Sequence, residues 1–211
     1  MRINPLVLLA ALLCAGSSFA QDSSSYTISL RSGNVIPARD VSDERVASFN
    51  QLSSRSAIPR FMLIQFEQLP DESEKRALAA SGIELLEYVP HNTYTATVRG
   101  PMNGPMLRTA HVRSLISLEP EQKMTPQLRS GMFPARTLKV AGKVDLWITY
   151  PQTVAEEDVN RELTAMGVEI IPTFYARHRI VAVRIAKEKL RDLASLGFVE
   201  YVQPAPGEDV M

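Results

Sequence analysis

Leu78-Ala79-Ala80-Ser81-Gly82-Ile83-Glu84-Leu85-Leu86 is the stretch that decides the fold, because it recurs 85 residues later as Leu163-Thr164-Ala165-Met166-Gly167-Val168-Glu169-Ile170-Ile171. In both copies a helical pattern ends at a glycine and an apolar strand pattern follows. The same offset aligns Ala96-Thr97-Val98-Arg99 with Val181-Ala182-Val183-Arg184. Self-similarity at a fixed period is typical of duplicated units, so the sequence predicts two. The alternative is a chance likeness of two α+β units of similar size.

Each unit has the order strand, helix, strand, strand, helix, strand. In the first unit the strands are predicted at 61–67, 83–88, 93–99 and 114–119, with helices ending at Gly82 and starting near Pro105. In the second they are predicted at 144–150, 168–174, 179–185 and 198–202, with a helix over 187–196. Asp71 with Glu74, and Thr153 with Glu156, have the spacing of a capping box at a helix start. The order predicts an α+β fold of two tandem ferredoxin-like βαββαβ units with antiparallel sheets.

The predicted boundaries follow from this repeat. They are a signal peptide at 1–20, a loosely structured N-terminal extension at 21–59, unit 1 at 60–123, a linker at 124–142, unit 2 at 143–203 and an extended tail at 204–211. The extension holds ten serines, with a strand expected near 26–30 and a helix near 42–52. The linker is rich in proline and glycine, which suits a connector.

The first twenty residues are typical of a secretory signal. Arg2 precedes a ten-residue apolar run, and Ser18-Phe19-Ala20 forms a small-x-small cleavage site, so a cut is predicted after Ala20. The run is shorter than the roughly 20 apolar residues that span a bilayer. A lipoprotein signal at Cys14 is the alternative, although bulky Leu13 precedes that cysteine. We therefore expect a secreted or periplasmic protein with no membrane attachment after cleavage.

Composition excludes several classes of function. The chain has 23 basic and 23 acidic residues, so no net field favours nucleic acid. Cys14 is its one cysteine, and the mature chain would therefore carry no disulfide, thiolate nucleophile or cysteine metal site. There is no G-x-S-x-G motif, and His91, His111 and His178 belong to no metal-binding pattern. The sequence thus predicts no cofactor, no metal and no catalytic residues.

The predicted sheet of unit 2 has one face left open by its helices. Its central strands would place Asp145, Trp147 and Thr149, and Ile180, Ala182 and Arg184, on that face. Contiguous exposed apolar surface usually marks a contact. One interpretation is that the two sheets of the chain pack on each other. The other is a docking surface for another protein, centred on Trp147 and Ile180.

The end of the chain, from Gln203 to Met211, contains Pro204 and Pro206 and offers little apolar surface. Prolines favour extended backbone. We predict a protruding tail in which Gln203, Pro204, Ala205 and Pro206 bind a protein partner.

Several motifs resemble a known family. They are Phe61-Met62-Leu63-Ile64-Gln65-Phe66, Gly82-Ile83, Tyr88-Val89-Pro90-His91-Asn92-Thr93-Tyr94 and the closing strand before Pro120. Together they look like the N-terminal prodomain of secreted subtilisin-like serine peptidases, here as two tandem prodomain-like units. Unit 2 keeps the glycine but has Arg177-His178-Arg179 where the family has Asn-x-Tyr or Asn-x-Phe.

The resemblance implies an intramolecular chaperone and inhibitor of a secreted subtilisin-like peptidase domain. In that family the open sheet docks on two helices of the protease and the tail lies in its substrate cleft. No histidine here is followed by glycine, so the catalytic motifs are absent from this stretch. We expect an N-terminal part of a peptidase precursor, with a stand-alone inhibitor as the alternative. A competing class is a periplasmic or surface binding module that holds a small effector between two ferredoxin-like units. A structural or adhesion segment is a third.

Overall fold

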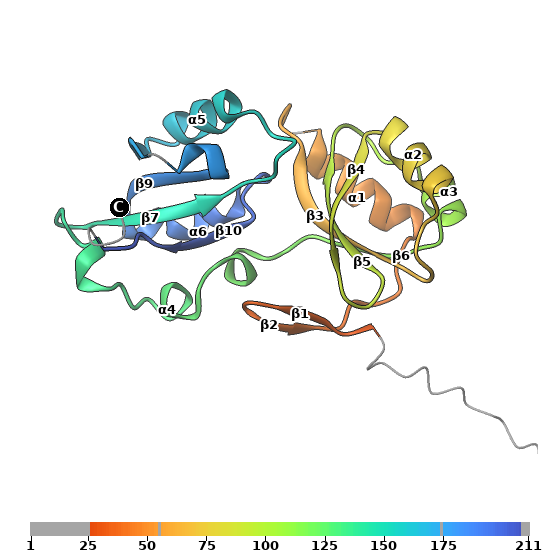
Figure 1. The fold of residues 1–211 in the computed structure, drawn as a ribbon, viewed down its shortest axis with the longest axis horizontal. Coiled ribbons are helices and arrows are strands. Elements are labelled where there is room, and N and C mark those ends of the chain that lie inside the picture. The colour runs from red at the N-terminus through yellow and green to blue at the C-terminus, as the bar shows by residue number, and fades with distance from the viewer. Residues whose placement is uncertain (1–25, 55, 174, 208–211) are drawn as a thin grey trace, which may run out of the picture.

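The computed structural model describes residues 26–54, 56–173 and 175–207 (Figure 1). Within these ranges the strands form one two-stranded sheet and two four-stranded sheets, with every pair of neighbouring strands antiparallel. Helices pack against both larger sheets, so the predicted α+β class with antiparallel sheets is confirmed. The predicted signal peptide and residues 208–211 lie outside the described residues.

The first four-stranded sheet belongs to residues 60–116. Its elements are β3 (Arg60–Phe66), α2 (Glu72–Ala80), β4 (Ile83–Val89), β5 (Thr93–Val98), α3 (Gly104–Thr109) and β6 (Val112–Ile116), and the strand order is β4-β5-β3-β6. Asp71 caps α2, since its Oδ1 accepts hydrogen bonds from the backbone N–H groups of Ser73 and Glu74 at 2.7 and 2.8 Å. The Glu74 side chain accepts from Asp71 N at 2.8 Å. The predicted capping box is therefore confirmed.

The second four-stranded sheet repeats the order of the first. Its elements are β7 (Lys143–Thr149), α5 (Glu156–Ala165), β8 (Glu169–Ile171), the 3₁₀ turn η4 (Ala176–His178), β9 (Ile180–Ala186), the 3₁₀ turn η5 (Lys187–Lys189), α6 (Leu190–Ser195) and β10 (Tyr201–Pro204). The strand order is β10-β7-β9-β8. In each unit the first and third strands thus lie in the centre of the sheet and the second and fourth at its edges.

The glycine of the repeat has the same structural role in both units. Gly82 and Gly167 follow α2 and α5 with φ values of +87° and +72°, in the left-handed region that favours glycine. At Gly82 there is a second reason. Its carbonyl accepts from Arg99 N at 2.8 Å, and an added Cβ would lie 2.4 Å from Arg99 O. This close approach joins the start of β4 to the end of β5.

Three predicted features of the second unit differ from the structure. Strand β8 covers three residues rather than 168–174, and β10 begins at Tyr201 rather than at 198, with Phe198 and Val199 buried just before it. A short apolar run cannot by itself distinguish a buried turn from a strand. The predicted capping box at Thr153 is wrong, since Ala155 precedes α5 and no side chain caps it. The Thr153 hydroxyl instead lies 2.8 Å from that of Thr97 in the first unit.

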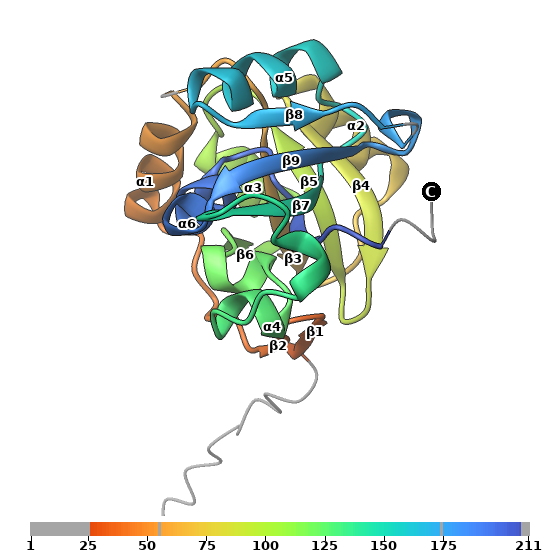
Figure 2. The same cartoon turned by 90° about the vertical axis from the view of Figure 1, so that its left-hand side faces the viewer.

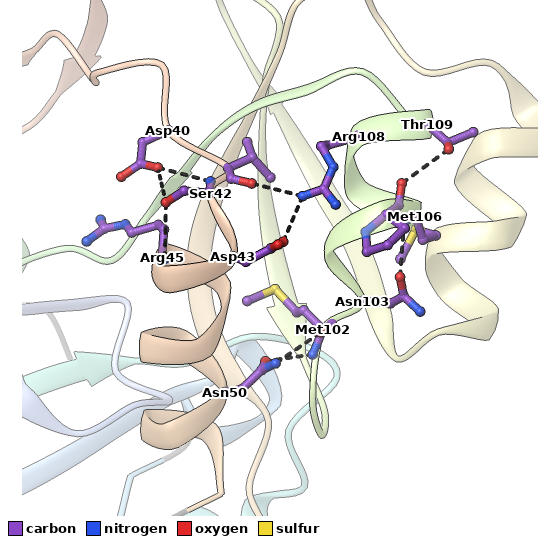
Figure 3. Close-up of polar contacts among 12 residues, drawn as sticks. Asp40, Ser42, Asp43, Arg45, Asn50, Met102, Asn103, Met106, Arg108 and Thr109 are labelled. Carbon is purple, nitrogen blue, oxygen red and sulfur yellow. Dashed lines mark hydrogen bonds and ion pairs between the residues drawn. The ribbon is translucent and has the colours of Figure 1, made fainter.

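The N-terminal segment packs tightly on the first unit, although the sequence predicts a largely loose extension. The hairpin of β1 (Ile28–Leu30) and β2 (Gly33–Val35) buries Ile28 against β3 and β6. Helix α1 (Asp43–Ser53) begins at Ser42, whose Oγ accepts from Arg45 N at 3.2 Å. The Asn50 side chain donates to Met102 O at 3.0 Å and accepts from Met102 N at 2.7 Å (Figure 3). These contacts make the segment part of the first unit.

The connection between the units is also packed. It contains η2 (Pro120–Lys123), α4 (Pro126–Arg129) and η3 (Ala135–Thr137). Met124 and Leu128 are buried in the second core and Phe133 packs against it. Met124 also forms an isolated parallel bridge with Val202 of β10. The connector therefore shields the β10 edge of the second sheet.

The two units meet with one end of the second sheet facing the first sheet. Figure 1 shows the strands of the second sheet running toward the first, and Figure 2, turned by 90°, shows one sheet behind the other. At the junction Phe61 N donates to Gly197 O at 2.8 Å, and the Lys123 ammonium donates to Leu196 O at 3.1 Å. The two sheets thus do not stack face to face, and the first sheet leaves much of the open face of the second sheet uncovered.

Candidate functional site

The open face of the second sheet carries the residues that the sequence singled out. Alternation along β7 directs Val144, Leu146 and Ile148 into the core and places Trp147 and Thr149 on the other face. Trp147 pairs in register with Ala182 of β9 and Gln203 of β10, and Thr149 pairs with Ile180. Trp147 and Ile180 therefore lie on one face of neighbouring strands.

An aromatic residue that the sequence analysis missed covers part of this face. The ring of Tyr175 lies 4.8 Å from that of Trp147, with an angle of 48° between the planes. Trp147, Tyr175 and Ile180 are each half-buried. Rings at this separation are attractive beyond the area they bury. We call Trp147, Tyr175 and Ile180 the aromatic patch, in which the ring of Tyr175 packs against that of Trp147.

Charged residues occupy the same face next to the aromatic patch. Arg184 donates from Nε to Asp145 Oδ1 at 2.7 Å and from a terminal nitrogen to Asp145 Oδ2 at 2.9 Å. It also donates to Glu169 Oε1 at 3.3 Å. The hydrogen bonds that Arg184 donates to Asp145 raise the pKa of Arg184. Asp145 is only 5 % exposed, and both of its carboxylate oxygens accept from the Arg184 guanidinium. The face thus combines an apolar anchor with a fixed polar neighbour.

The predicted tail begins inside the sheet. Gln203 and Pro204 belong to β10, where they pair with Trp147 and Leu146. Ala205 N donates to Asp145 O at 3.1 Å, and Arg136 Nε donates to Ala205 O at 3.2 Å. Pro204 is tolerated because β10 is an edge strand, where a missing N–H costs no ladder bond. Protrusion from Gln203 onward is therefore wrong for residues 203–205, and the chain leaves the sheet at Pro206.

A second candidate site is the inter-unit cleft, which has a volume of about 370 Å³. It lies between the first sheet, the β1–β2 hairpin and the facing end of the second sheet. Its polar lining includes Arg31, Glu87, Gln122, His178, Arg179 and Glu200. Burial and the nearby charge of Glu87 raise the pKa of Glu200 to about 7, against the opposing effect of Arg179. Burial also raises the pKa of Tyr150 in the same cleft. Carboxylates and cations from both units thus converge in the inter-unit cleft.

The described residues contain no group of three or more histidine, cysteine, aspartate or glutamate side chains that could hold a metal ion. In the same part of the chain, none of the helices combines the length and apolar character needed to cross a bilayer. The histidine at the inter-unit cleft, His178, accepts a hydrogen bond at Nε2 from Arg177 Nε at 3.1 Å.

Comparison with known protein families finds a match in the first part of the chain. A family model described as a domain of unknown function, DUF8729, matches residues 29–119. The matched stretch begins in β1 and ends after β6, so it takes in the N-terminal hairpin, α1 and the whole first sheet. No curated protein and no solved structure matches the chain. The aromatic patch and β10 lie outside the matched stretch.

Proposed function

We propose that this chain is a prodomain-like chaperone and inhibitor of a secreted subtilisin-like serine peptidase, and that it forms the N-terminal part of the peptidase precursor. In this proposal the chain is exported, its signal peptide is cut after Ala20, and it has no catalytic residues, metal or cofactor of its own. Its partner is a peptidase domain, in cis or in trans. Neither nucleic acid nor a membrane takes part.

The fold supports this proposal through its topology. We propose that both units are ferredoxin-like, since each has the order βαββαβ and each sheet has its first and third strands in the centre. The sequence resemblance to subtilisin-like prodomains requires that plan. It also requires an accessible sheet face and a C-terminal segment that can extend into a cleft.

One observation carries the proposal. Gln203 lies directly opposite Trp147 in the pairing of β10 with β7. The chain therefore leaves the sheet next to the aromatic patch, just after the backbone hydrogen bond from Ala205 N to Asp145 O. A protein that docked on Trp147 and Ile180 would receive Pro206 and the residues after it at the rim of the same interface. Buried aromatic residues are frequent anchors at the centre of such interfaces.

A second candidate function is a binding module for a small effector. The observation that favours it is the inter-unit cleft, where Glu87, Arg179 and Glu200 converge between the units. Such a module would bind its ligand without any peptidase. Its ligand binding would depend on Glu87, Arg179 and Glu200 rather than on Trp147.

Binding to a catalytically inactive subtilisin-like peptidase domain tests the docking proposal. Residues 21–211 and the variant Trp147→Ala would be compared by surface plasmon resonance, and we expect the variant to bind more weakly by about 2 kcal/mol or more. Tyr88→Ala is the matched control, because Tyr88 is an aromatic residue that is 52 % exposed on β4 of the first unit. Unchanged binding of Trp147→Ala together with a large loss of stability would contradict the proposal, because Trp147 would then be a core residue.

A further inference from the structure

The inter-unit cleft combines a buried apolar floor with charges of both signs. Phe61 and Leu63 of β3 form the floor, on the face of the first sheet opposite to the core residues Met62 and Ile64. The rest of its apolar lining comes from Leu30, Val89, Leu118 and Tyr201. Its volume of about 370 Å³ lies within the range of small-molecule sites, about 300–1,000 Å³. The floor therefore suits the apolar part of a small ligand.

Two carboxylates line the inter-unit cleft, one from each unit. Glu87 belongs to β4, where its backbone N–H donates to Thr95 Oγ1 at 2.9 Å, and Glu200 lies just before β10. Glu87 is exposed and Glu200 is half-buried, so Glu200 is the inner carboxylate. The charge of Glu87 helps to raise the pKa of Glu200 across the junction. Two like charges that meet in this way are unfavourable unless a cation lies near them.

Two arginines line the same cleft. Arg179, just before β9, has a φ of +59°, which is uncommon for a residue other than glycine and indicates that its surroundings hold it in place. Its carbonyl accepts from Tyr150 N at 3.3 Å, and its guanidinium donates to Gln152 Oε1 at 3.5 Å. Arg31, in the turn between β1 and β2, lies 5.3 Å from the centre of the Tyr201 ring. These partners are uncharged, so both arginines keep their charge.

The four charged groups are not neutralised by direct pairing with one another. Within the described residues, no ion pair within 4.0 Å involves Glu87, Glu200, Arg31 or Arg179. Arg179 is nonetheless near enough to Glu200 to lower its pKa, against the larger effect of burial. A carboxylate is suited to a ligand ammonium, and a guanidinium to a ligand carboxylate. The cleft thus offers neighbouring positions for one charge of each sign.

We propose that the inter-unit cleft binds a free α-amino acid with an apolar side chain. The ammonium would lie at Glu200 and Glu87, the carboxylate at Arg179, and the side chain on the apolar floor. An α-amino acid fits because its two charged groups are attached to one carbon atom, as close together as the charges of Glu200 and Arg179 require. The bound ligand would contact both units.

The inference rests on the second candidate function, because it names the ligand class of the same cleft. It does not depend on peptidase docking at the aromatic patch, which lies outside the lining of the inter-unit cleft.

Calorimetric titration of residues 21–211 with L-phenylalanine and, separately, with L-leucine tests the inference at pH 8, above the Glu200 pKa of about 7. We expect saturable binding of at least one of them. The matching amine without the carboxylate and the matching acid without the ammonium should each bind at least about tenfold more weakly, because a hydrogen bond between charged groups is lost. For phenylalanine these compounds are 2-phenylethylamine and 3-phenylpropionate.

Glu200→Gln and Arg179→Gln should each weaken binding of the amino acid at least about tenfold. Their matched controls are Glu188→Gln on η5 and Arg76→Gln on α2, both at exposed positions outside the cleft, and these should bind as the parent chain does. Glu87→Gln, at an exposed position, is a second variant that should also weaken binding if Glu200→Gln fails to fold.

Absence of saturable binding for both amino acids would overturn the inference. If the amine or the acid binds as tightly as the amino acid, and Glu200→Gln weakens that binding, the ligand class is wrong while the second candidate function stands. Binding that neither Glu200→Gln nor Arg179→Gln weakens more than its control would contradict both.

Discussion

The charge of Glu200 should make the second unit less stable at neutral pH than at mildly acidic pH. Glu200 lies just before β10, where its backbone N–H donates to Thr149 O at 2.9 Å, and its side chain lines the inter-unit cleft. Burial is the main cause of its raised pKa, and the charge of Glu87 from the first unit adds to it. The other titratable or charged groups lining this cleft are Arg31, Tyr150, His178, Arg179 and Tyr201.

The magnitude follows from the two pKa values. The pKa of Glu200 rises from an ordinary value of 4.5 to about 7 in the folded chain. Because the native state binds this proton more tightly than the unfolded state, the stabilisation is complete below pH 4.5 and is lost as the pH rises through 7. At about 1.4 kcal/mol per pKa unit, the loss is about 3 kcal/mol. Glu200→Gln cannot ionise, so above pH 7 it should be more stable than the parent chain by up to this amount.

Urea unfolding between pH 4.5 and 8 would measure the effect. Trp147 is the single tryptophan of the chain, so its fluorescence reports on the second unit. The difference between parent and variant removes the contributions of other carboxyl groups, and Glu188→Gln, at an exposed position on η5, is the control. Parallel stability curves for the parent chain and Glu200→Gln across this pH range would refute the reasoning.

Three further results are expected. Lys123→Met should raise the free energy of unfolding at pH 7 by up to about 3 kcal/mol, because the lowered pKa of about 8 means that the folded chain carries this charge at a cost. This gain in stability should shrink as the pH rises from 8 to 10.5, and a loss of stability at pH 7 would contradict the prediction. Gly82→Ala should destabilise the first unit by about 2 kcal/mol or more in urea unfolding, since it combines a positive φ with a Cβ 2.4 Å from Arg99 O. Gly100→Ala, with φ +80° and nothing within 4 Å of the added Cβ, should cost about 1 kcal/mol, and equal losses at the two glycines would show that the close approach has no effect.

The sequence was informative where local patterns decide structure. The repeated helix, glycine and strand placed α2, α5, Gly82 and Gly167 correctly, because helix periodicity and the left-handed glycine are local features. Strand ends were less well predicted. Strand β6 ends at Ile116 rather than 119, and Pro204 extends β10, because the pairing partner sets these limits.

Features set by contacts between distant segments could not be predicted. The Arg113 guanidinium donates to Gln65 Oε1 and Pro37 O, both at 2.9 Å, and stacks on Tyr26 at 3.9 Å. This buried network attaches the N-terminal segment to β3 and β6. From the sequence alone, polar residues such as Arg113 and Gln65 would be expected at the surface. Lys123 likewise has an ordinary sequence context, and it is buried in the structure, where α6 packs against η2. The sequence analysis identified Trp147 of the aromatic patch, because it is a tryptophan on a predicted open sheet face. It missed Tyr175, because that residue comes from a separate segment and meets Trp147 only in the folded chain.

Inhibition of a secreted subtilisin-like peptidase tests the central proposal most directly. Residues 21–211 would be assayed against a panel of such peptidases, including those encoded in the same genome, beside a shorter chain that ends at Ala205 and so keeps β10 and its bond to Asp145. The proposal predicts dose-dependent inhibition by the longer chain and inhibition at least about tenfold weaker by the shorter one, since the segment from Pro206 onward would occupy the substrate cleft. Absence of inhibition across the panel, or equal inhibition by both chains, would contradict it.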